Sequence, residues 1–86
     1  MMNLSDAQRR QLCDWKNATL GGYNLTTDCG GGNKAQTDVN QDACVMSGLV
    51  TRCAVTVRQF ETCIVAQAPS HGCVLPFEQC KPLFCQ

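Results

Sequence analysis

The sequence predicts a mostly α-helical fold: a small, disulfide-stapled bundle of three to four short helices, with an extended or short β segment near residues 23–29. Two observations support this fold class. The chain has eight cysteines in 86 residues, and several segments combine helix-capping residues with apolar residues at helical spacing. A chain of this length buries only about 60% of its unfolded surface, so small domains commonly add disulfides. We therefore expect one disulfide-rich domain over residues 1–86.

The first predicted helix is marked at both ends. Ser5 and Gln8 fit an S-x-x-Q capping box, and Asp6 in the first turn suits the helix dipole. The helix carries an apolar stripe formed by Leu12, Cys13, Trp15 and Ala18. Gly21-Gly22 supplies the stop, because glycine readily takes the left-handed conformation at a helix C-terminus.

An extended segment and a second helix follow. Residues 23–29 alternate weakly between two sets of side chains, which indicates a short strand, and the Gly-Gly-Gly-Asn run at 30–33 is expected to break regular structure. A second helix is predicted to begin near residues 38–40, because apolar residues follow at helical spacing. These residues are Val39, Ala43, Met46 and Val50. Gly48 weakens the last turn.

The third predicted helix has the strongest start signal. Thr56 can cap it with Gln59 as its partner. Val55 and Phe60 stand at the two positions of a hydrophobic staple, which fixes the angle at which a chain enters a helix. Pro69 is expected to end this helix.

A last short helix is predicted from Pro76, a favoured first position, to Lys81, with Pro82 as the stop. The cysteines divide evenly between the predicted helices and the segments beside them. Four lie on predicted helices: Cys13, Cys44, Cys63 and Cys80. Four lie in loops or near element ends: Cys29, Cys53, Cys73 and Cys85. We expect all eight to be disulfide-bonded. Their distribution favours disulfides between a helix and a loop, and the connectivity stays open.

The cysteine spacing argues against metal binding and thiol catalysis. Structural zinc sites and redox-active thiols favour close pairs such as C-x-x-C, and no C-x-x-C occurs in this chain. The nearest approaches are the pair Cys80 and Cys85 and the run His71-Gly72-Cys73. We therefore expect no metal and no cofactor.

Catalytic machinery is sparse, and we expect no enzyme activity. His71 is the single histidine, and it lies in a Pro-Ser-His-Gly turn. Ser70 beside it lacks the context of a nucleophile elbow. Glu61 and Glu78 are the two glutamates, and they show no paired-carboxylate spacing. The glycine run at residues 30–32 lacks the motif of a phosphate-binding loop.

The charge and the cysteine content limit which classes of partner and which locations are expected. Seven basic and seven acidic residues leave no net charge, which argues against nucleic acid and anionic membranes. No apolar run reaches the about 18 residues that cross a bilayer. Met1 to Asp6 lacks the basic and apolar regions of a signal peptide. Either this is a mature domain with an added start methionine, or the protein belongs to a reducing cytosol. Because eight cysteines suit an oxidising compartment, we expect the first, a monomer that is extracellular or in a bacterial cell envelope.

Three N-glycosylation sequons begin at Asn3, Asn17 and Asn24. Two interpretations stay open. The sequons could mark a glycosylated surface in a eukaryotic secretory pathway, or belong to a bacterial protein that is never glycosylated.

Two C-x9-C spacings, from Cys53 to Cys63 and from Cys63 to Cys73, invite a comparison. They resemble the twin C-x9-C motif of the coiled-coil-helix-coiled-coil-helix family of the mitochondrial intermembrane space. In that family each motif occupies its own helix, and two disulfides tie the helices together. Here the motifs share Cys63, and Pro69 and Gly72 interrupt the second.

A second resemblance covers nearly the whole chain. Its motifs are Leu4-Ser5-Asp6, Leu12-Cys13-Asp14-Trp15, Leu20-Gly21-Gly22-Tyr23, Cys29-Gly30-Gly31-Gly32 and Thr56-Val57-x-x-Phe60-Glu61-x-Cys63. With these motifs the chain resembles small cysteine-rich proteins of myxobacteria and related bacteria, which are secreted or lipid-anchored. The resemblance implies an extracellular or envelope location and carries over no functional residues.

These observations predict a disulfide-stabilised binding or interaction module whose partner is an unidentified protein or surface. One alternative is a secreted effector, toxin or inhibitor on the same scaffold. It would use an exposed loop, such as residues 30–34 or 69–72, because function tends to lie on loops held by rigid elements. The other alternative is an intermembrane-space or metal-handling protein of the twin C-x9-C kind.

Overall fold

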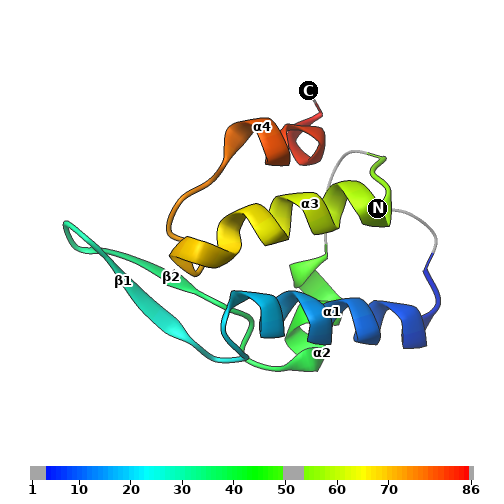
Figure 1. Cartoon of the computed structure of the whole chain (residues 1–86). Helices are drawn as coiled ribbons and strands as arrows, with labels where there is room; N and C mark the ends of the chain where they lie inside the picture. Colours follow the sequence, from blue (N-terminus) through cyan, green and yellow to red (C-terminus); the bar gives the residue numbers. More distant parts are fainter. Residues whose placement is uncertain (1–3, 50–53, 86) are drawn as a thin grey trace.

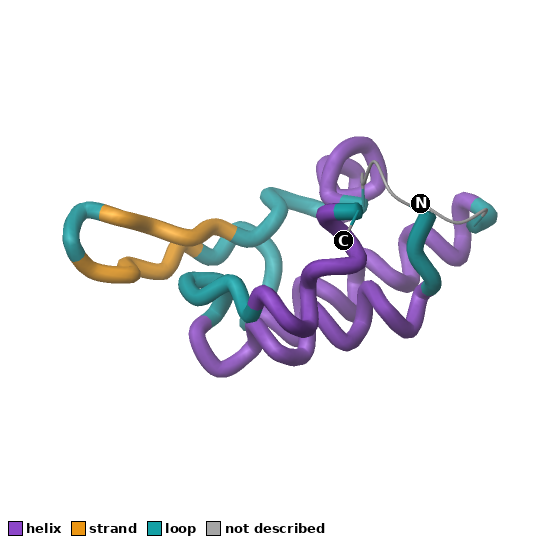
Figure 2. The backbone as a smooth tube through the Cα atoms, turned by 90° about the horizontal axis from the view of Figure 1, so that it is seen from above, coloured by secondary structure: helices purple, strands orange, loops and turns teal. Residues whose placement is uncertain are grey.

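The computed structural model describes residues 4–49 and 54–85. The helices are α1 (Asp6–Leu20), α2 (Gln41–Ala43), α3 (Val57–Gln67) and α4 (Phe77–Cys80), and the strands are β1 (Thr26–Gly30) and β2 (Asn33–Gln36). Figure 1 shows α1 and α3 side by side, α4 on the far side of α3 from α1, and the β1–β2 hairpin extending away from the helices. Figure 2 shows from above that the hairpin is separate from the helices. The predicted mostly α-helical fold is confirmed.

Helix α1 begins and ends where the sequence predicts. The hydroxyl of Ser5 accepts a hydrogen bond from the Gln8 amide N–H, and the Gln8 side chain accepts one from the Ser5 N–H. At the other end Gly21 is left-handed, with φ of 118°. The N–H of Gly21 bonds to the carbonyl of Ala18 and the N–H of Gly22 to that of Asn17, which is the Schellman arrangement.

Helix α3 has the predicted start, and it ends before Pro69 in a short 3-10 extension. Thr56 and Gln59 form the second capping box, and Val55 and Phe60 on either side of it are both buried. The α-helix ends at Gln67, and a 3-10 turn then carries the chain through Ala68–Ser70. Pro69 therefore lies inside this short extension rather than at an abrupt stop, because the first positions of a 3-10 turn need no proline N–H.

The core lies between α1, α3 and the turn that follows α2. Its buried residues are Leu12, Cys13, Leu20, Cys44, Leu49, Phe60 and Ile64. Partly buried apolar side chains close its edges, namely Leu4, Trp15, Tyr23, Val45, Val57 and Leu83. Helices α1 and α3 pack through their apolar faces. A shallow line of contact between the two helices, the α1–α3 seam, lies at the rim of this core.

Two of the predicted helices differ in detail. The second is much shorter: α2 is a single turn capped by Asn40, and a π-helical turn, Cys44–Gly48, continues it. The predicted residue Val50 falls outside the described residues. The fourth α-helix ends before Pro82, at Cys80, and a 3-10 turn, Lys81–Phe84, then includes this proline near its start.

The largest departure from the sequence prediction is the second strand. The glycine run does not end regular structure but makes a hairpin turn, in which Gly30 pairs with Asn33 across Gly31 and Gly32. Both turn glycines have positive φ, 60° and 80°, as the type I′ turns of two-residue hairpins require. Strand β2 escaped prediction because Asn-Lys-Ala-Gln contains no β-branched or aromatic residue.

A bulge interrupts the hairpin pairing at Cys29. Asp28 pairs with Lys34 and Gly30 with Asn33, so Cys29 is the extra residue on β1. The Asp28 carboxylate accepts a hydrogen bond from the Gly30 N–H at 2.9 Å, which supports the local bend. Bulges redirect a side chain out of the regular alternation. Here the redirected side chain is a cysteine that forms a disulfide with the helical body.

Candidate functional site

Three disulfides join pairs of described cysteines, and their pattern corrects the prediction. Cys13 bonds to Cys44 and Cys63 to Cys80, and both bonds connect one helical segment with another. The third joins Cys29 of the hairpin to Cys73 in the loop before α4. None of these three bonds joins a helix to a loop, because the buried helical cysteines meet one another inside the packed body. The helix-to-loop pairing expected from the sequence is therefore not found among them. Cys85 is also disulfide-bonded, and Cys53 lies outside the described residues.

The pairings bear on the C-x9-C comparison. Cys63 and Cys73, the two described cysteines of that array, bond to Cys80 and Cys29, which lie outside it. The arrangement therefore differs from two helices tied through their C-x9-C cysteines. In residues 4–49 and 54–85 no group of three or more His, Cys, Asp or Glu side chains could hold a metal ion.

A buried polar cluster ties α1 to the segment after the hairpin. Asn17 is fully buried; its amide donates to the Cys13 carbonyl and the Asp38 carboxylate and accepts from the Asp38 N–H, all at 3.0–3.1 Å. Lys16 adds an ion pair with Asp38 at 3.0 Å. Because the Asn17 nitrogen is enclosed and bonded, the folded protein does not offer this sequon for glycosylation. Asn24 is exposed, and Asn3 lies outside the described residues.

Two further contacts join α1 to the hairpin base and to α2. The Tyr23 hydroxyl donates to Asp14 at 2.7 Å, and burial of the phenol together with this hydrogen bond raises the pKa of Tyr23 to about 12. Arg10 bonds to both Asp42 and Asp6, and these two carboxylates raise the pKa of its guanidinium above its usual range. These groups hold the fold together, since each is satisfied by a neighbour within the chain.

The two loops proposed from the sequence have different surroundings. The hairpin tip, residues 30–34, is exposed throughout. In the turn at residues 69–72, Ser70 donates to the Gln67 carbonyl and accepts from the Val74 N–H, and the His71 Nδ1 lies 3.1 Å from the Leu20 carbonyl oxygen. Both side chains therefore support the α3 and α1 ends, and neither is arranged as a nucleophile with its base.

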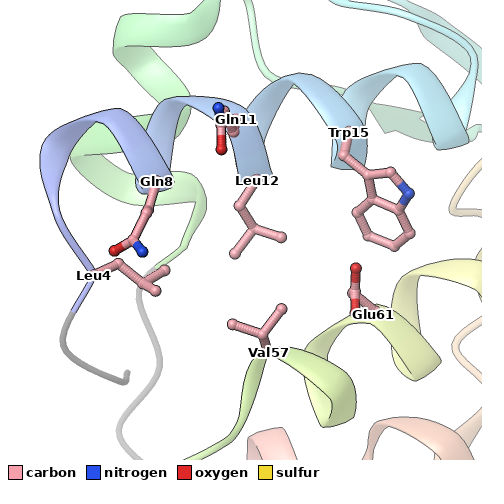
Figure 3. Close-up of a pocket in the computed structure, with 7 residues that line it drawn as sticks. All are labelled: Leu4, Gln8, Gln11, Leu12, Trp15, Val57 and Glu61. Carbon is pink, nitrogen blue, oxygen red and sulfur yellow. The ribbon is translucent and has the colours of Figure 1, made fainter.

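Among the residues that the structure describes, a groove between α1 and α3 is the strongest candidate site (Figure 3). It has a volume of about 340 Å³ and opens to solvent. Its lining residues are Leu4, Gln8, Gln11, Leu12, Trp15, Val57 and Glu61. The apolar side chains from the two helices face one another across it, with Leu12 opposite Val57 and Trp15 opposite Glu61.

Polar side chains border the groove without closing it. The Gln8 oxygen is engaged in the α1 capping box. Within the described residues, neither the Trp15 indole N–H nor the Glu61 carboxylate has a hydrogen-bond or ion-pair partner. The groove therefore combines an apolar floor with polar groups that are still available, as small-ligand and side-chain pockets commonly do.

A second cleft, of about 290 Å³, lies between the hairpin base and α3. Its polar lining is already engaged within the chain: Lys16 pairs with Asp38, and His71 contacts the Leu20 carbonyl. This cleft is therefore a weaker candidate than the groove between α1 and α3.

One exposed apolar segment stands apart from both clefts. Val74, Leu75 and Phe77 are each at least half exposed, and they lie between Cys73 and Cys80, which both form disulfides. Such consecutive exposure of large apolar side chains is unusual on a soluble surface and commonly marks a contact site.

Comparison with protein families, with characterised proteins and with solved structures finds no match to this chain. The resemblance to small cysteine-rich proteins of myxobacteria therefore stays a prediction. None of the described helices is long and apolar enough to cross a membrane. The fold and the site together define a small α-helical domain with several disulfides and an open groove between its two longest helices.

Sequence reasoning placed some of the groove residues on their helices and did not identify the groove. Leu12 and Trp15 belong to the apolar stripe of the first predicted helix, and Val57 and Glu61 stand one turn apart in the third. Which faces of the two helices meet depends on tertiary packing. No local sequence signal locates the groove, because it depends on the contact between two helices that are far apart in the chain.

Proposed function

We propose that this protein is a binding module of an oxidising compartment, extracellular or in a cell envelope, and that it holds an apolar segment of a partner protein in the α1–α3 groove. The main observation that supports this proposal is that the groove lies between two helices, each of which is held by a buried disulfide. Cys13 of α1 bonds to Cys44, and Cys63 of α3 bonds to Cys80. A groove with rigid walls loses little conformational entropy on binding, which favours affinity.

The size of the groove supports a peptide side chain as its occupant. Drug-sized ligands occupy pockets of about 300–1,000 Å³, so 340 Å³ suits one or two side chains. The groove opens to solvent, which gives a polypeptide segment access to it. Helix grooves of this kind bind apolar anchors of partner segments.

Selection of random peptides on the oxidised protein tests this proposal. We expect selected peptides to quench or shift the fluorescence of Trp15, the single tryptophan. Val57→Asp places a charge on the apolar floor and should weaken binding about tenfold or more, as truncation of an interface anchor does. Val39→Asp is the matched control, because Val39 is 56% exposed and lies outside the groove; it should leave the affinity unchanged.

A second variant keeps the proposal testable if Val57→Asp fails to fold. Gln11 is exposed at the groove rim, so Gln11→Phe should fill the groove without disturbing the core and should also weaken binding, and it keeps Trp15 as the single fluorescent tryptophan. The proposal is wrong if no peptide is enriched, or if peptides bind the wild type and both groove variants equally.

The compartment is tested separately by intact mass. Protein isolated from its natural source should gain no mass from a thiol-alkylating reagent under native conditions and should react fully after reduction. Four or more reactive thiols in the native protein would exclude an oxidising compartment, because cytosolic thiols are kept reduced.

The exposed segment between Cys73 and Cys80 supports a second candidate, a secreted effector or inhibitor that presents this segment to its target. A segment held by disulfides at both ends resists cleavage and keeps its shape. The same peptide selection separates the two functions. Binding that is lost in Leu75→Asp and retained in Val57→Asp would favour the effector or inhibitor.

A further inference from the structure

Glu61 differs from every other carboxylate of the chain. The sequence has seven acidic side chains, and six are engaged. Asp6 and Asp42 bond to Arg10, Asp38 to Lys16, Glu78 to Lys81, Asp14 to Tyr23 and Asp28 to the Gly30 N–H. Among the described residues Glu61 has no such partner, and it lines the groove. An unpaired acid at an apolar groove indicates a cationic ligand group.

The surroundings of Glu61 narrow the chemistry of that cation. Its side chain, from α3, points toward the ring of Trp15, from α1 (Figure 3). A tryptophan face attracts a cation through its quadrupole, and arginine uses this contact more often than lysine. Arginine also stacks its planar guanidinium on aromatic rings and bonds to a carboxylate with two parallel N–H groups. The apolar stretch beside this pair, Leu12 and Val57, suits the aliphatic stem of the same side chain.

We propose that the groove recognises an arginine side chain of the partner protein, with its guanidinium between Trp15 and Glu61 and its stem over Leu12 and Val57. This inference rests on the proposed function and names the anchor residue of the partner. Charge complementarity supports the choice of arginine, because the groove lining contains one negative side chain and no positive one.

The test compares two peptides that differ in charge alone. The probes are acetyl-Leu-Arg-Leu amide and the same peptide with citrulline, which keeps the shape of arginine and lacks its charge. Trp15 fluorescence reports binding. We expect the arginine peptide to bind about five- to tenfold more tightly, as a partly exposed ion pair with an added cation–π contact allows. The preference should fall as salt is raised.

Glu61→Gln identifies the source of the preference. In this variant the preference for the arginine peptide should fall to about two- to threefold, because the contact of the guanidinium with Trp15 remains and the ion pair is lost. The matched control is Glu78→Gln, because Glu78 is exposed, paired with Lys81 and outside the groove; it should keep the full preference for arginine. Glu61 is partly exposed, so its replacement by an amide of the same size should not affect folding, which circular dichroism checks.

The outcomes separate this inference from the proposed function. Equal binding of the two peptides by the wild type, or an arginine preference that is undiminished in Glu61→Gln, overturns the arginine assignment. If Val57→Asp still weakens binding in that case, the groove remains the binding site and the proposed function stands. Failure of the arginine peptide to bind at millimolar concentration also overturns the assignment, and the peptides from random selection then decide the function. Binding that neither groove variant affects overturns both.

Discussion

The helical body and the β hairpin use disulfides in opposite ways. In the body, Cys13, Cys44, Cys63 and Cys80 are at most 1% exposed, and they lie among the residues of the packed interior. The two strands of the hairpin, which are described in full, bury no residue, and their cysteine, Cys29, is exposed. In the body a disulfide reinforces contacts that already exist. In the hairpin it substitutes for a core that the two strands lack, since an isolated hairpin is marginally stable in water.

The base of the hairpin belongs to the body. The Thr37 hydroxyl donates to the Gly22 carbonyl at 2.6 Å and accepts from the Leu25 N–H at 2.8 Å, and the Asn24 N–H bonds to the Asp38 carbonyl. Beyond this point the Cys29–Cys73 disulfide ties the hairpin to the helical body. The comparison therefore separates a cooperative core from an attached arm.

Removal of the two kinds of disulfide gives the largest expected contrast. We expect Cys13→Ala with Cys44→Ala to lower the free energy of unfolding by about 4 kcal/mol, because the bond closes a long loop and its ends stay fixed in the native state. Cys29→Ala with Cys73→Ala should cost about 1–2 kcal/mol, because the released hairpin gains freedom in the native state as well. Urea unfolding followed by circular dichroism measures both.

Loop length alone predicts that loss of Cys29–Cys73 costs more stability than loss of Cys13–Cys44. The measurement therefore distinguishes the two explanations. The sequence separation is 44 for Cys29–Cys73 and 31 for Cys13–Cys44, and a longer loop costs more entropy to close. An equal or larger loss for the hairpin pair would show that the arm is part of the cooperative core.

Partial reduction should reveal the same contrast kinetically. With limiting reductant and rapid alkylation, Cys29 and Cys73 should be labelled at least about 100-fold faster than Cys13 and Cys44, because buried bonds react only after local opening. Peptide mapping by mass spectrometry gives the order. Labelling of the two pairs at similar rates would contradict the separation of body and arm.

Two glycines test the junction and the tip of the arm. Gly21 has a φ of +118°, and a Cβ added there would lie only 2.6 Å from the Leu25 Cδ2 and 3.2 Å from the His71 Nδ1. We therefore expect Gly21→Ala to lower the free energy of unfolding by about 3 kcal/mol. Gly32→Ala has a positive φ but open space around it, so about 1 kcal/mol is expected. Thermal melts of the two variants compare them. A larger loss at Gly32 would contradict the comparison.

The smallest effect concerns Tyr23 at the junction. Burial of the phenol, and then its hydrogen bond to Asp14, raise the pKa of Tyr23 from 10.0 to about 12. Folding thus favours the neutral phenol, and this contribution to stability is complete below pH 10 and is lost as the pH rises through 12. Ultraviolet titration is specific because Tyr23 is the single tyrosine.

The native midpoint should lie near 12, and that of the reduced, denatured chain near about 10. Asp14→Asn removes the negative charge and should lower the native midpoint while leaving it above that of the denatured chain. A native midpoint equal to the denatured one would show that the junction is open to water.

The parts of this fold that could be predicted depend on residues close together in the sequence. Both capping boxes join residues three apart, Ser5 with Gln8 and Thr56 with Gln59, and each marks its helix correctly. Strand β2 could not be predicted because its residues have low strand propensity and are held by a turn, a bulge and a distant disulfide. The groove likewise depends on which faces of α1 and α3 meet.

By itself the sequence determined a small, mostly helical, cysteine-rich domain and the starts of its two main helices, because composition and capping act locally. Only the tertiary structure decided which cysteines pair, where the hairpin attaches, and that Trp15 and Glu61 face each other across a groove. Those features join residues far apart along the chain, and their geometry follows from the packing of the whole core rather than from any local preference.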